Sequence, residues 1–381
     1  MGPAEISDPP DWRRRARRFV QERLAPISAE IDRADRVPSD MMARLGAEGF
    51  TGLGIPPEWG GSGGNTESTA AVLEELAVAN AAVATDLSVH LSVCAAPILR
   101  WGTDAQRARF LRPLAQGRYL GAFGLTEPGV GSDAAHLATR YERVPAGFRL
   151  RGSKMFITNG ATAAVVLAFA TRDPALGSRG ISAFLIPQGT PGYSVAQRLD
   201  KMGIRGSETT ELVFDGAQLS DDALLGAEGE GLSIALGALA GGRIGIAACA
   251  LGVARAAFEE MCRSTRLRTM EEDRACVARA YVELESARAL VEAAARTKDA
   301  GRPFEIAASA AKLAASKAAV SIASVGLDIA GPEGTRVGHP AERLLRDARV
   351  FPIVEGTTEI QERLLGRLLI EHGGPLAERT P

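Results

Sequence analysis

Residues 124–133 read Gly-Leu-Thr-Glu-Pro-Gly-Val-Gly-Ser-Asp, a polar loop that directly follows an apolar run. Glycines let the backbone turn tightly, and such a turn can bring its N–H groups close to a planar polar ligand or a phosphate. The same residue types also form ordinary turns, which are the more common outcome for a loop of this kind taken alone. The loop therefore marks a strand end and leaves its own function open.

A β domain is expected around this loop, over residues 119–226. Short runs of β-branched, aromatic and aliphatic residues alternate there with Gly, Pro and Asp. This pattern predicts a small antiparallel domain, either a barrel or a sandwich. The runs are residues 120–125, 148–151, 165–169, 181–186 and 211–214.

Helices are expected before and after the β domain. Apolar residues recur at three- and four-residue spacing within residues 1–118, as in amphipathic helices. Residues 227–381 contain four long Ala-rich segments, for which antiparallel packing is the economical arrangement; they are residues 231–265, 273–300, 304–329 and 359–370. The sequence thus predicts an α+β multidomain fold with an N-terminal helical domain, a middle antiparallel β domain and a C-terminal four-helix bundle.

Composition argues against several classes of protein. A net charge of −2 offers no strongly basic face for a nucleic acid. The four cysteines and four histidines lack disulfide-framework or metal-ligand spacing, so we expect no metal and a reducing, cytoplasmic environment. Residues 232–254 are apolar enough to span a bilayer, but Arg243 at their centre favours a helix buried in protein, and we expect no membrane association.

Two further segments carry candidate chemistry. In residues 152–160, Phe156 and Thr158 lie two apart on a predicted strand, so both could face a ring; taken alone, a cross-strand packing pair is the better explanation of the spacing. In residues 346–361, Glu355 stands between an apolar run and the Gly-Thr that precedes the last helix. Apolar surroundings would raise the pKa of this carboxyl toward that of a base, while a helix N-terminal carboxylate is an equally good explanation.

No G-x-G-x-x-G or P-loop motif is present, so a Rossmann or P-loop nucleotide site is unsupported. The three segments above instead resemble the acyl-CoA dehydrogenase family, in the family's order and spacing and over essentially the whole chain. Short- and branched-chain members are the most similar in character. Further matching segments are Gly60-Gly61 and residues 201–205, 214–216 and 241–244.

The resemblance implies an enzyme, an oxidoreductase that acts on CH–CH groups, with FAD and an acyl thioester enclosed by the three domains. It implies flavin contacts for Phe123, Leu125, Thr126, Gly131, Ser132, Phe156, Thr158, Arg268, Thr357 and Glu359. It implies substrate contacts for Ser132, Arg243, Val354 and Gly356.

The resemblance also implies the mechanism. Glu355 takes the α-proton of the acyl group, and the β-hydrogen leaves as hydride to N5 of the flavin. Some members carry the base just before the arginine that matches Arg243. That position is Gly242 here, which cannot act as a base, so Glu355 is the expected catalytic residue.

The chain departs from the family on the side expected to hold the adenine end of FAD. The R-x-x-F-G motif is absent, and Arg268 is the best positional match to its arginine. The Q-x-x-G-G motif appears as Asp-Ile-Ala-Gly-Pro at residues 328–332. We therefore keep two hypotheses: FAD held by altered contacts, which the intact flavin-ring motifs favour, or a flavin-free binding or non-redox role.

The partners implied are an acyl-CoA or acyl-carrier-protein thioester, and an electron-transfer flavoprotein or oxygen as acceptor. A homotetramer or homodimer is expected. The helix over residues 88–99 resembles those of short- and branched-chain members and contains no arginine to bind a terminal carboxylate. The expected substrate is therefore a short or branched acyl thioester.

Overall fold

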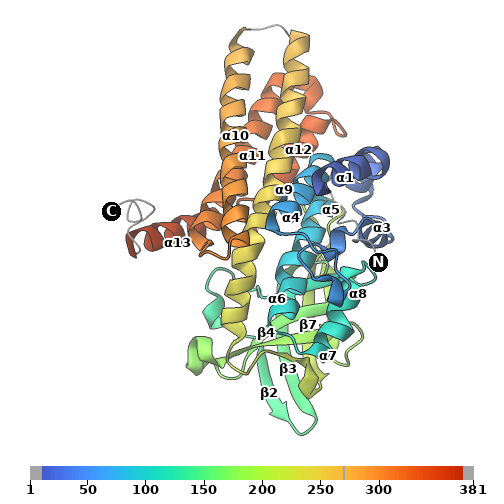
Figure 1. Cartoon of the computed structure of the whole chain (residues 1–381), viewed down its shortest axis with the longest axis vertical. Helices are drawn as coiled ribbons and strands as arrows, with labels where there is room; N and C mark the ends of the chain where they lie inside the picture. Colours follow the sequence, from blue (N-terminus) through green and yellow to red (C-terminus); the bar gives the residue numbers. More distant parts are fainter. Residues whose placement is uncertain (1–10, 269–270, 372–381) are drawn as a thin grey trace, which may run out of the picture.

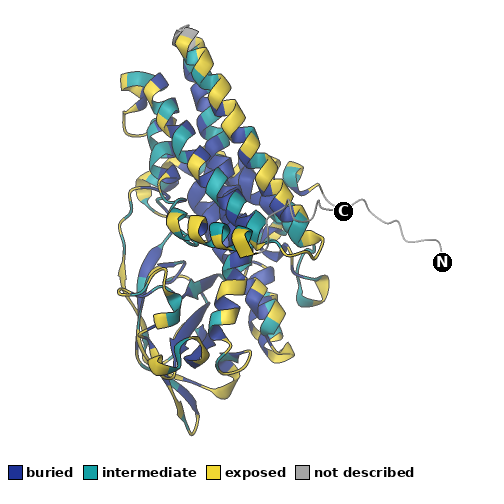
Figure 2. Cartoon of the chain, turned by 90° about the vertical axis from the view of Figure 1, so that its left-hand side faces the viewer, coloured by how far each residue is buried: buried dark blue, intermediate teal, exposed yellow. Residues whose placement is uncertain are grey.

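The sheet and the long C-terminal helices lie at opposite ends of the molecule, with the N-terminal helices on one side between them (Figure 1). The computed structural model describes residues 11–268 and 271–371. Buried residues follow the inner surfaces of the helices and the sheet (Figure 2). The predicted order of a helical region, a β region and a second helical region is confirmed.

Asparagines begin the two central helices of the N-terminal region. Asn65 accepts a hydrogen bond from Ser68 N (2.9 Å), and Asn80 accepts one from Val83 N (3.0 Å). After α5 the helix passes through a π-helical turn, His90–Ala95, before α6. The bounds are α1 Trp12–Phe19, α2 Ser28–Ala34, α3 Met41–Ala47, α4 Thr66–Ala79, α5 Ala81–Val89, α6 Ala96–Trp101, α7 Asp104–Gln106 and α8 Arg112–Ala115.

One eight-stranded sheet forms the middle region, in the order β6-β7-β3-β2-β4-β5-β8, with β1 beside β4. Its two faces are buried in different apolar clusters, because successive side chains of β4 and β5 point to opposite faces. The bounds are β1 Gly121–Gly124, β2 Arg140–Val144, β3 Gly147–Thr158, β4 Val165–Thr171, β5 Ile181–Pro187, β6 Tyr193–Arg198, β7 Thr209–Leu219 and β8 Leu224–Leu225.

The sheet is mixed, which corrects the expectation of a purely antiparallel domain. β1 pairs in parallel with β4, from Gly121 opposite Val165 to Gly124 opposite Ala168. The loop at 124–133 and the β2–β3 hairpin separate the two strands in sequence. That connection is long enough for the chain to return and run in the same direction, as a parallel pair requires.

Five helices follow the sheet, and the longest of them forms the centre of the helical core. α9 packs against α10 and α11 and also against α4 and α5 of the N-terminal region. At Gly252 a β-carbon would lie 2.6 Å from that of Ala77, so the bare glycine permits the close approach of α4 to α9. The bounds are α9 Gly231–Arg268, α10 Glu271–Asp299, α11 Glu305–Gly334, α12 Pro340–Ala348 and α13 Thr358–Glu371.

All four long helices expected in the C-terminal region are present as α9, α10, α11 and α13. α13 packs on α11 and projects sideways from the other three (Figure 1). α4 lies instead against both α9 and α10. The helical core is therefore shared between the N-terminal and C-terminal parts of the chain.

Two buried carboxylates join these helices. Glu74 and Glu75 of α4 are each 2 % exposed. Glu74 pairs with Arg13 of α1 (2.8 Å), Arg255 of α9 (2.8 Å) and Arg288 of α10 (2.7 Å). Because each cation comes from a different helix, this cluster fixes how the four helices meet.

By length and composition alone, three helices are apolar enough to cross a bilayer: residues 81–101, 231–266 and 305–334. Most of the apolar window of the first two is buried inside the protein. Arg243, at the centre of the second, is only 6 % exposed. The apolar character of the first two helices is thus accounted for by packing in the core, whereas 44 % of the apolar window of the third is buried.

Candidate active site

Glu355 lies in the segment between α12 and α13, with its carboxylate turned toward α9. Both of its carboxylate oxygens are buried and accept no hydrogen bond from the described residues. A β-carbon added to Gly242 of α9 would lie 2.9 Å from Glu355 Cδ and closer still to Oε2. The carboxylate therefore rests against the bare backbone of α9.

Burial governs the acidity of this group. Removal from water raises the pKa of Glu355 to about 8, against the opposing effect of the Arg243 and Lys312 charges. A carboxylate with a pKa in this range is a far stronger base than an exposed one. The site thus contains a desolvated carboxylate with no hydrogen bond to restrain it.

The helix-capping explanation for Glu355 does not hold. Thr357 begins α13: its Oγ1 accepts a hydrogen bond from Ile360 N (3.4 Å), and its carbonyl accepts one from Gln361 N (2.9 Å). Glu359, in the first turn of α13, is exposed. Glu355 stands two residues before the cap, which leaves its side chain free for another role.

Sequence reasoning missed Lys312, a fully buried lysine of α11 beside this segment. Its Nζ donates a hydrogen bond to the carbonyl oxygen of Gly356 (2.7 Å). Burial lowers the pKa of Lys312 to about 8, and the charge of Glu355 opposes that effect. Its position in an Ala-rich helix gave no local signal that it would contact Gly356, 44 residues away.

The chain before Glu355 is anchored to the rest of the protein. Arg346 of α12 pairs with Asp32 of α2 (2.7 Å). The buried carboxylate of Asp347 accepts a hydrogen bond from Ile204 N (2.6 Å). Two of the matched segments, residues 201–205 and 346–361, are thereby joined directly.

The loop at 124–133 and the strand β3 are joined by a buried ion pair that sequence reasoning also missed. Lys154 Nζ lies 2.7 Å from Glu127 Oε1, with the two side chains 0 % and 3 % exposed. Glu127 also accepts hydrogen bonds from Ala138 N (2.6 Å) and Thr139 N (3.0 Å). The pair therefore closes the loop that runs from β1 to β2.

The expected flavin contacts in this region fall into a buried and an exposed group. Leu125 is buried, and the carbonyl of half-buried Thr126 accepts a hydrogen bond from Met155 N (2.8 Å). Gly131 and Ser132 are exposed, and a β-carbon on Gly131 would meet no atom within 4 Å. The loop thus has a firmly anchored start, at Leu125 and Thr126, and an accessible backbone further on, at Gly131 and Ser132.

Phe156 is not a cross-strand packing residue. It is 66 % exposed, has a left-handed backbone (φ +60°) and lies where the pairing of β3 with β7 is irregular. Thr158, two residues on, is half-buried. A large aromatic side chain held out in this way is available to stack on a planar ring.

Phe123, at the end of β1, connects this face to the helix expected at the acyl group. It packs in an apolar cluster with Val89 and Val93 of α5 and its π-helical turn, and with Ala238 and Leu239 of α9. The buried hydroxyl of Ser88 in α5 has no hydrogen-bond partner in the described residues. π-helical turns inside α-helices occur frequently at functional sites.

One expected contact is only partly described. Arg268 is the last residue of α9, and its side chain lies outside the described residues. Residues 328–332, where the family motif is altered, break the helical geometry of α11 at Gly331 (φ +67°). Within the described ranges, no group of three or more His, Cys, Asp or Glu residues could hold a metal ion.

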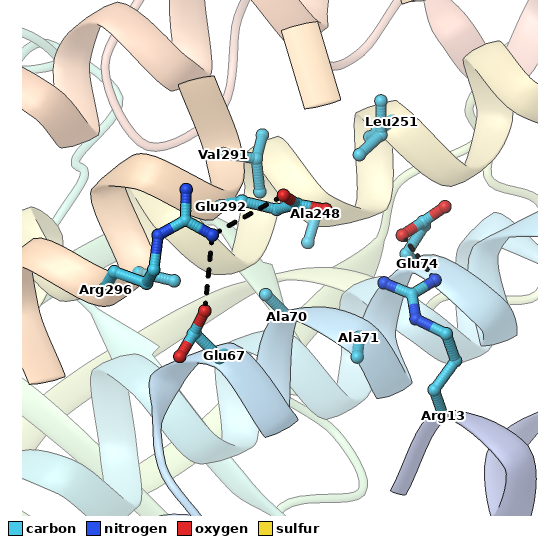
Figure 3. Close-up of a pocket in the computed structure, with 11 residues that line it drawn as sticks. Arg13, Glu67, Ala70, Ala71, Glu74, Ala248, Leu251, Val291, Glu292 and Arg296 are labelled. Carbon is cyan, nitrogen blue, oxygen red and sulfur yellow. Dashed lines mark hydrogen bonds and ion pairs between the residues drawn. The ribbon is translucent and has the colours of Figure 1, made fainter. Parts of the chain in front are cut away.

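Figure 3 shows a cavity that is separate from this site. It encloses about 310 Å³ between α1, α4, α9 and α10, with Arg296 near Glu67 and Glu292 at one end and the Arg13–Glu74 pair at the other. A second cavity of about 690 Å³ lies between the α2–α3 loop and the edge of the sheet. Neither is lined by Glu355 or by an expected flavin contact.

The proteins that this chain is similar to are oxidoreductases that act on the CH–CH groups of acyl thioesters. Three family models match the chain: the acyl-CoA dehydrogenase N-terminal domain over residues 10–118, the middle domain over 122–217 and the C-terminal domain over 229–370. The chain belongs to the acyl-CoA dehydrogenase family. Its cofactor is FAD, as in the family, and a flavin-free role is not favoured.

Individual relatives agree with this assignment. The short-chain specific acyl-CoA dehydrogenase of Clostridium acetobutylicum is 38 % identical over 361 residues, which cover 93 % of this chain and 95 % of the relative. The butyryl-CoA dehydrogenase structure from Megasphaera elsdenii superposes with a TM-score of 0.92 at 38 % identity, over 94 % and 97 % of the two chains. A structure described as the electron transferring flavoprotein of Acidaminococcus fermentans superposes with a TM-score of 0.93 at 36 % identity, over 97 % and 99 %.

The residues of the site fit a flavin. Phe156 presents an exposed aromatic side chain, Gly131 an unobstructed backbone, and Glu355 a carboxylate that accepts no hydrogen bond from the part of the chain that the structure describes. These three features are compatible with a planar ligand bound beside an acyl substrate.

Proposed function

We propose that this enzyme desaturates a short or branched acyl-CoA, with Glu355 as the base that removes the α-proton. The observation that carries the proposal is the state of the Glu355 carboxylate: both oxygens are buried, accept no hydrogen bond from residues 11–268 or 271–371, and lie against Gly242. Burial of a carboxylate without a partner is unfavourable, and groups in this state are found preferentially at functional sites.

The chain's own residues would orient the reaction as follows. Glu355 receives the α-proton on a carboxylate oxygen. Arg243, 6 % exposed with an unpartnered Nε, lies close enough to favour the ionised form of Glu355. Val354 and Gly356 flank the base in the chain and would line the space for the substrate. Exclusion of water keeps the base strong and prevents it from exchanging its proton with solvent.

The flavin would be held between the loop at 124–133 and β3. Phe123, Leu125, Thr126, Gly131, Ser132, Phe156 and Thr158 would hold its ring, with Thr357, Glu359 and Arg268 nearer its phosphates. Bound there, FAD supplies the acceptor for the β-hydrogen, which leaves as hydride. Ser132 would also contact the thioester.

The acyl group proposed is short or branched. α5 and its π-helical turn, residues 81–95, carry no arginine or lysine, so a dicarboxylic acyl group would find no cation on this helix. Val89 and Val93 pack against Phe123 and α9 in one apolar cluster. Relatives named for short-chain substrates support this size.

Finer properties of the enzyme are proposals as well. Coenzyme A is the proposed carrier and an electron-transfer flavoprotein the proposed acceptor, with an acyl carrier protein and oxygen as the alternatives. We expect a cytoplasmic homotetramer or homodimer. A panel of thioesters on both carriers, read by flavin bleaching with and without peroxide detection, distinguishes these alternatives.

Glu355→Gln tests the proposed function directly. The variant keeps the shape of the side chain but cannot accept the proton. It should bind FAD with the wild-type stoichiometry, yet show no bleaching of flavin absorbance when butyryl-CoA is added without oxygen. Bleaching at the wild-type rate would remove Glu355 from the role of base.

A further inference from the structure

The turn that carries the proposed base has an unfavourable backbone. Glu355 has φ +52° and Gly356 has φ +100°, so two successive residues are left-handed. For a residue with a side chain this conformation costs about 1 kcal/mol or more. Contacts from elsewhere in the fold must therefore hold the turn.

α11 supplies the firmest of these contacts. Lys312 donates to Gly356 O (2.7 Å), and one helical turn later Ser316 donates to Phe351 O (3.2 Å). Gln361 of α13 adds longer bonds to Glu355 O (3.3 Å) and Gly356 O (3.5 Å). Of the bonds to the two left-handed residues, the one from Lys312 is the shortest and the only one given by a charged group.

An ammonium is a costly group with which to hold a neutral carbonyl. Lys312 is 0 % exposed, and no carboxylate of the described residues lies in ion-pair contact with it. A neutral donor would satisfy the Gly356 carbonyl with less desolvation. What the charge adds is a field at Glu355, whose carboxylate also lacks a contact partner.

The charged and titratable groups around Glu355 come from three helices. Arg243 of α9 and Lys312 of α11 favour its ionised form, while Cys249 of α9 is a neutral thiol affected by the Glu355 charge. Glu359 of α13 and Arg243 act on Lys312, and Glu305 of α11 acts on Arg243. Lys312 is the member of this set that also touches the backbone of the turn.

We propose that Lys312 is a positioning residue for proton abstraction: it fixes the turn that carries Glu355 and supplies a buried positive charge that favours the ionised carboxylate. The inference rests on the proposed role of Glu355 as base. It places a residue needed for proton abstraction on α11, a helix that carries none of the residues expected to contact the flavin or the thioester.

Lys312→Met tests the inference, because methionine fills the same buried space without charge or donor. The variant should retain FAD, but anaerobic flavin bleaching by butyryl-CoA at pH 7 should slow at least tenfold. The pH at which bleaching reaches half its maximum rate should rise by one unit or more, since a tenfold rate change corresponds to one pKa unit. Lys317→Met is the matched control: Lys317 is an exposed lysine of α11 that pairs with Glu362 of α13 (2.9 Å), and its variant should keep the wild-type rate and profile.

A second readout does not depend on turnover. The carboxyl C=O stretch of protonated Glu355, identified in infrared difference spectra by its absence in Glu355→Gln, should titrate at higher pH in Lys312→Met than in the wild type. Lys312→Gln, which keeps a hydrogen-bond donor without the charge, is measured in the same way in case the methionine variant does not fold.

The outcomes separate this inference from the proposed function. Wild-type bleaching and an unmoved infrared titration in either folded variant would overturn the role of Lys312 while leaving Glu355 as base. Loss of fold or of FAD in both variants would also overturn it and make Lys312 a structural residue. Bleaching by Glu355→Gln would instead remove the proposed base itself.

Discussion

The carboxylate of Glu355 faces the bare α-carbon of Gly242, so closely that a β-carbon at Gly242 would overlap Oε2 and lie 2.9 Å from Cδ. The family's alternative position for the base is therefore also the surface against which the present base lies. Glycine at this position does two things: it carries no competing carboxylate, and it leaves room for the one that comes from the α12–α13 segment.

Gly242→Ala should displace that carboxylate. The added methyl group must push Glu355 away from α9, and a base shifted by an ångström loses much of its efficiency. We expect flavin bleaching by butyryl-CoA to slow by about tenfold to a hundredfold, with FAD retained.

Gly326→Ala in α11 is the control for this substitution. A β-carbon there meets only ordinary contacts, at 3.5 Å from Ala257 O. It should keep the wild-type rate and gain some stability, since alanine favours a helix interior by about 1 kcal/mol over glycine. An unchanged rate in Gly242→Ala would mean that Glu355 does not need its position against α9.

The rate of flavin reduction should depend on pH through Glu355. Burial raises the pKa of Glu355 to about 8, and only the ionised form can accept a proton. The rate in substrate-saturated, anaerobic mixing should therefore rise as the pH increases from 6, reach half its maximum near the pKa and level off only above about pH 9. A rate that is flat from pH 6 to 9 would contradict this assignment of the base.

The sequence identified the segments of the site because each is local. Glu355, Phe156 and the loop at 124–133 lie within short motifs whose order is visible along the chain. The sequence did not show which of these residues are buried, exposed or hydrogen-bonded. The helix-capping alternative for Glu355, for example, was excluded by the hydrogen bond from Ile360 N to Thr357 Oγ1 in the structure. The exposure of Phe156 likewise depends on an irregularity in strand pairing.

Contacts between distant residues account for what sequence reasoning missed. Lys312 resembles any surface lysine of an Ala-rich helix until α11 packs against Gly356. The pairing of Lys154 with Glu127 spans two matched segments, and each segment suggested only its own strand or turn. The parallel pairing of β1 with β4 also depends on the path of the chain between them, which local patterns do not specify.

Lys154→Met should weaken flavin binding and stability together. Burial would raise the pKa of Glu127, but Lys154 together with the hydrogen bonds from Thr139 and Ala138 outweighs that effect and lowers the pKa. Removal of Lys154 leaves a buried charge unpaired, at a cost of about 3 kcal/mol. It also loosens the loop at 124–133, so we expect a lower FAD content after purification, measured by absorbance, and a lower unfolding temperature.

Arg151→Met on the same strand is the control for the buried pair. Arg151 and Asp215 form a 3.5 Å ion pair with side chains 66 % and 88 % exposed. Exposed pairs of this kind contribute about 0.5 kcal/mol or less, so this variant should keep its FAD. Equal effects of the two substitutions would show that the loop does not depend on the buried pair.

The buried carboxylates of α4, which join the four helices, should make the free energy of unfolding depend on pH. Burial alone would raise the pKa of Glu75, but Arg255 and Arg17 outweigh it and hold the pKa at about 2. Because the folded pKa lies below the ordinary value of 4.5, this contribution is complete above pH 4.5 and is lost as the pH falls toward 2.

Glu75→Gln should therefore lower the free energy of unfolding by about 2 kcal/mol at pH 7. The difference in free energy of unfolding between this variant and the wild type, measured by urea unfolding, should become smaller as the pH is lowered from 5 to 3. Glu292→Gln is the control: it changes an exposed carboxylate 3.6 Å from Arg296 and should differ little from wild type at either pH. A difference for Glu75→Gln that stays constant over this range would mean that packing, and not the charge of Glu75, holds α4 to α1 and α9.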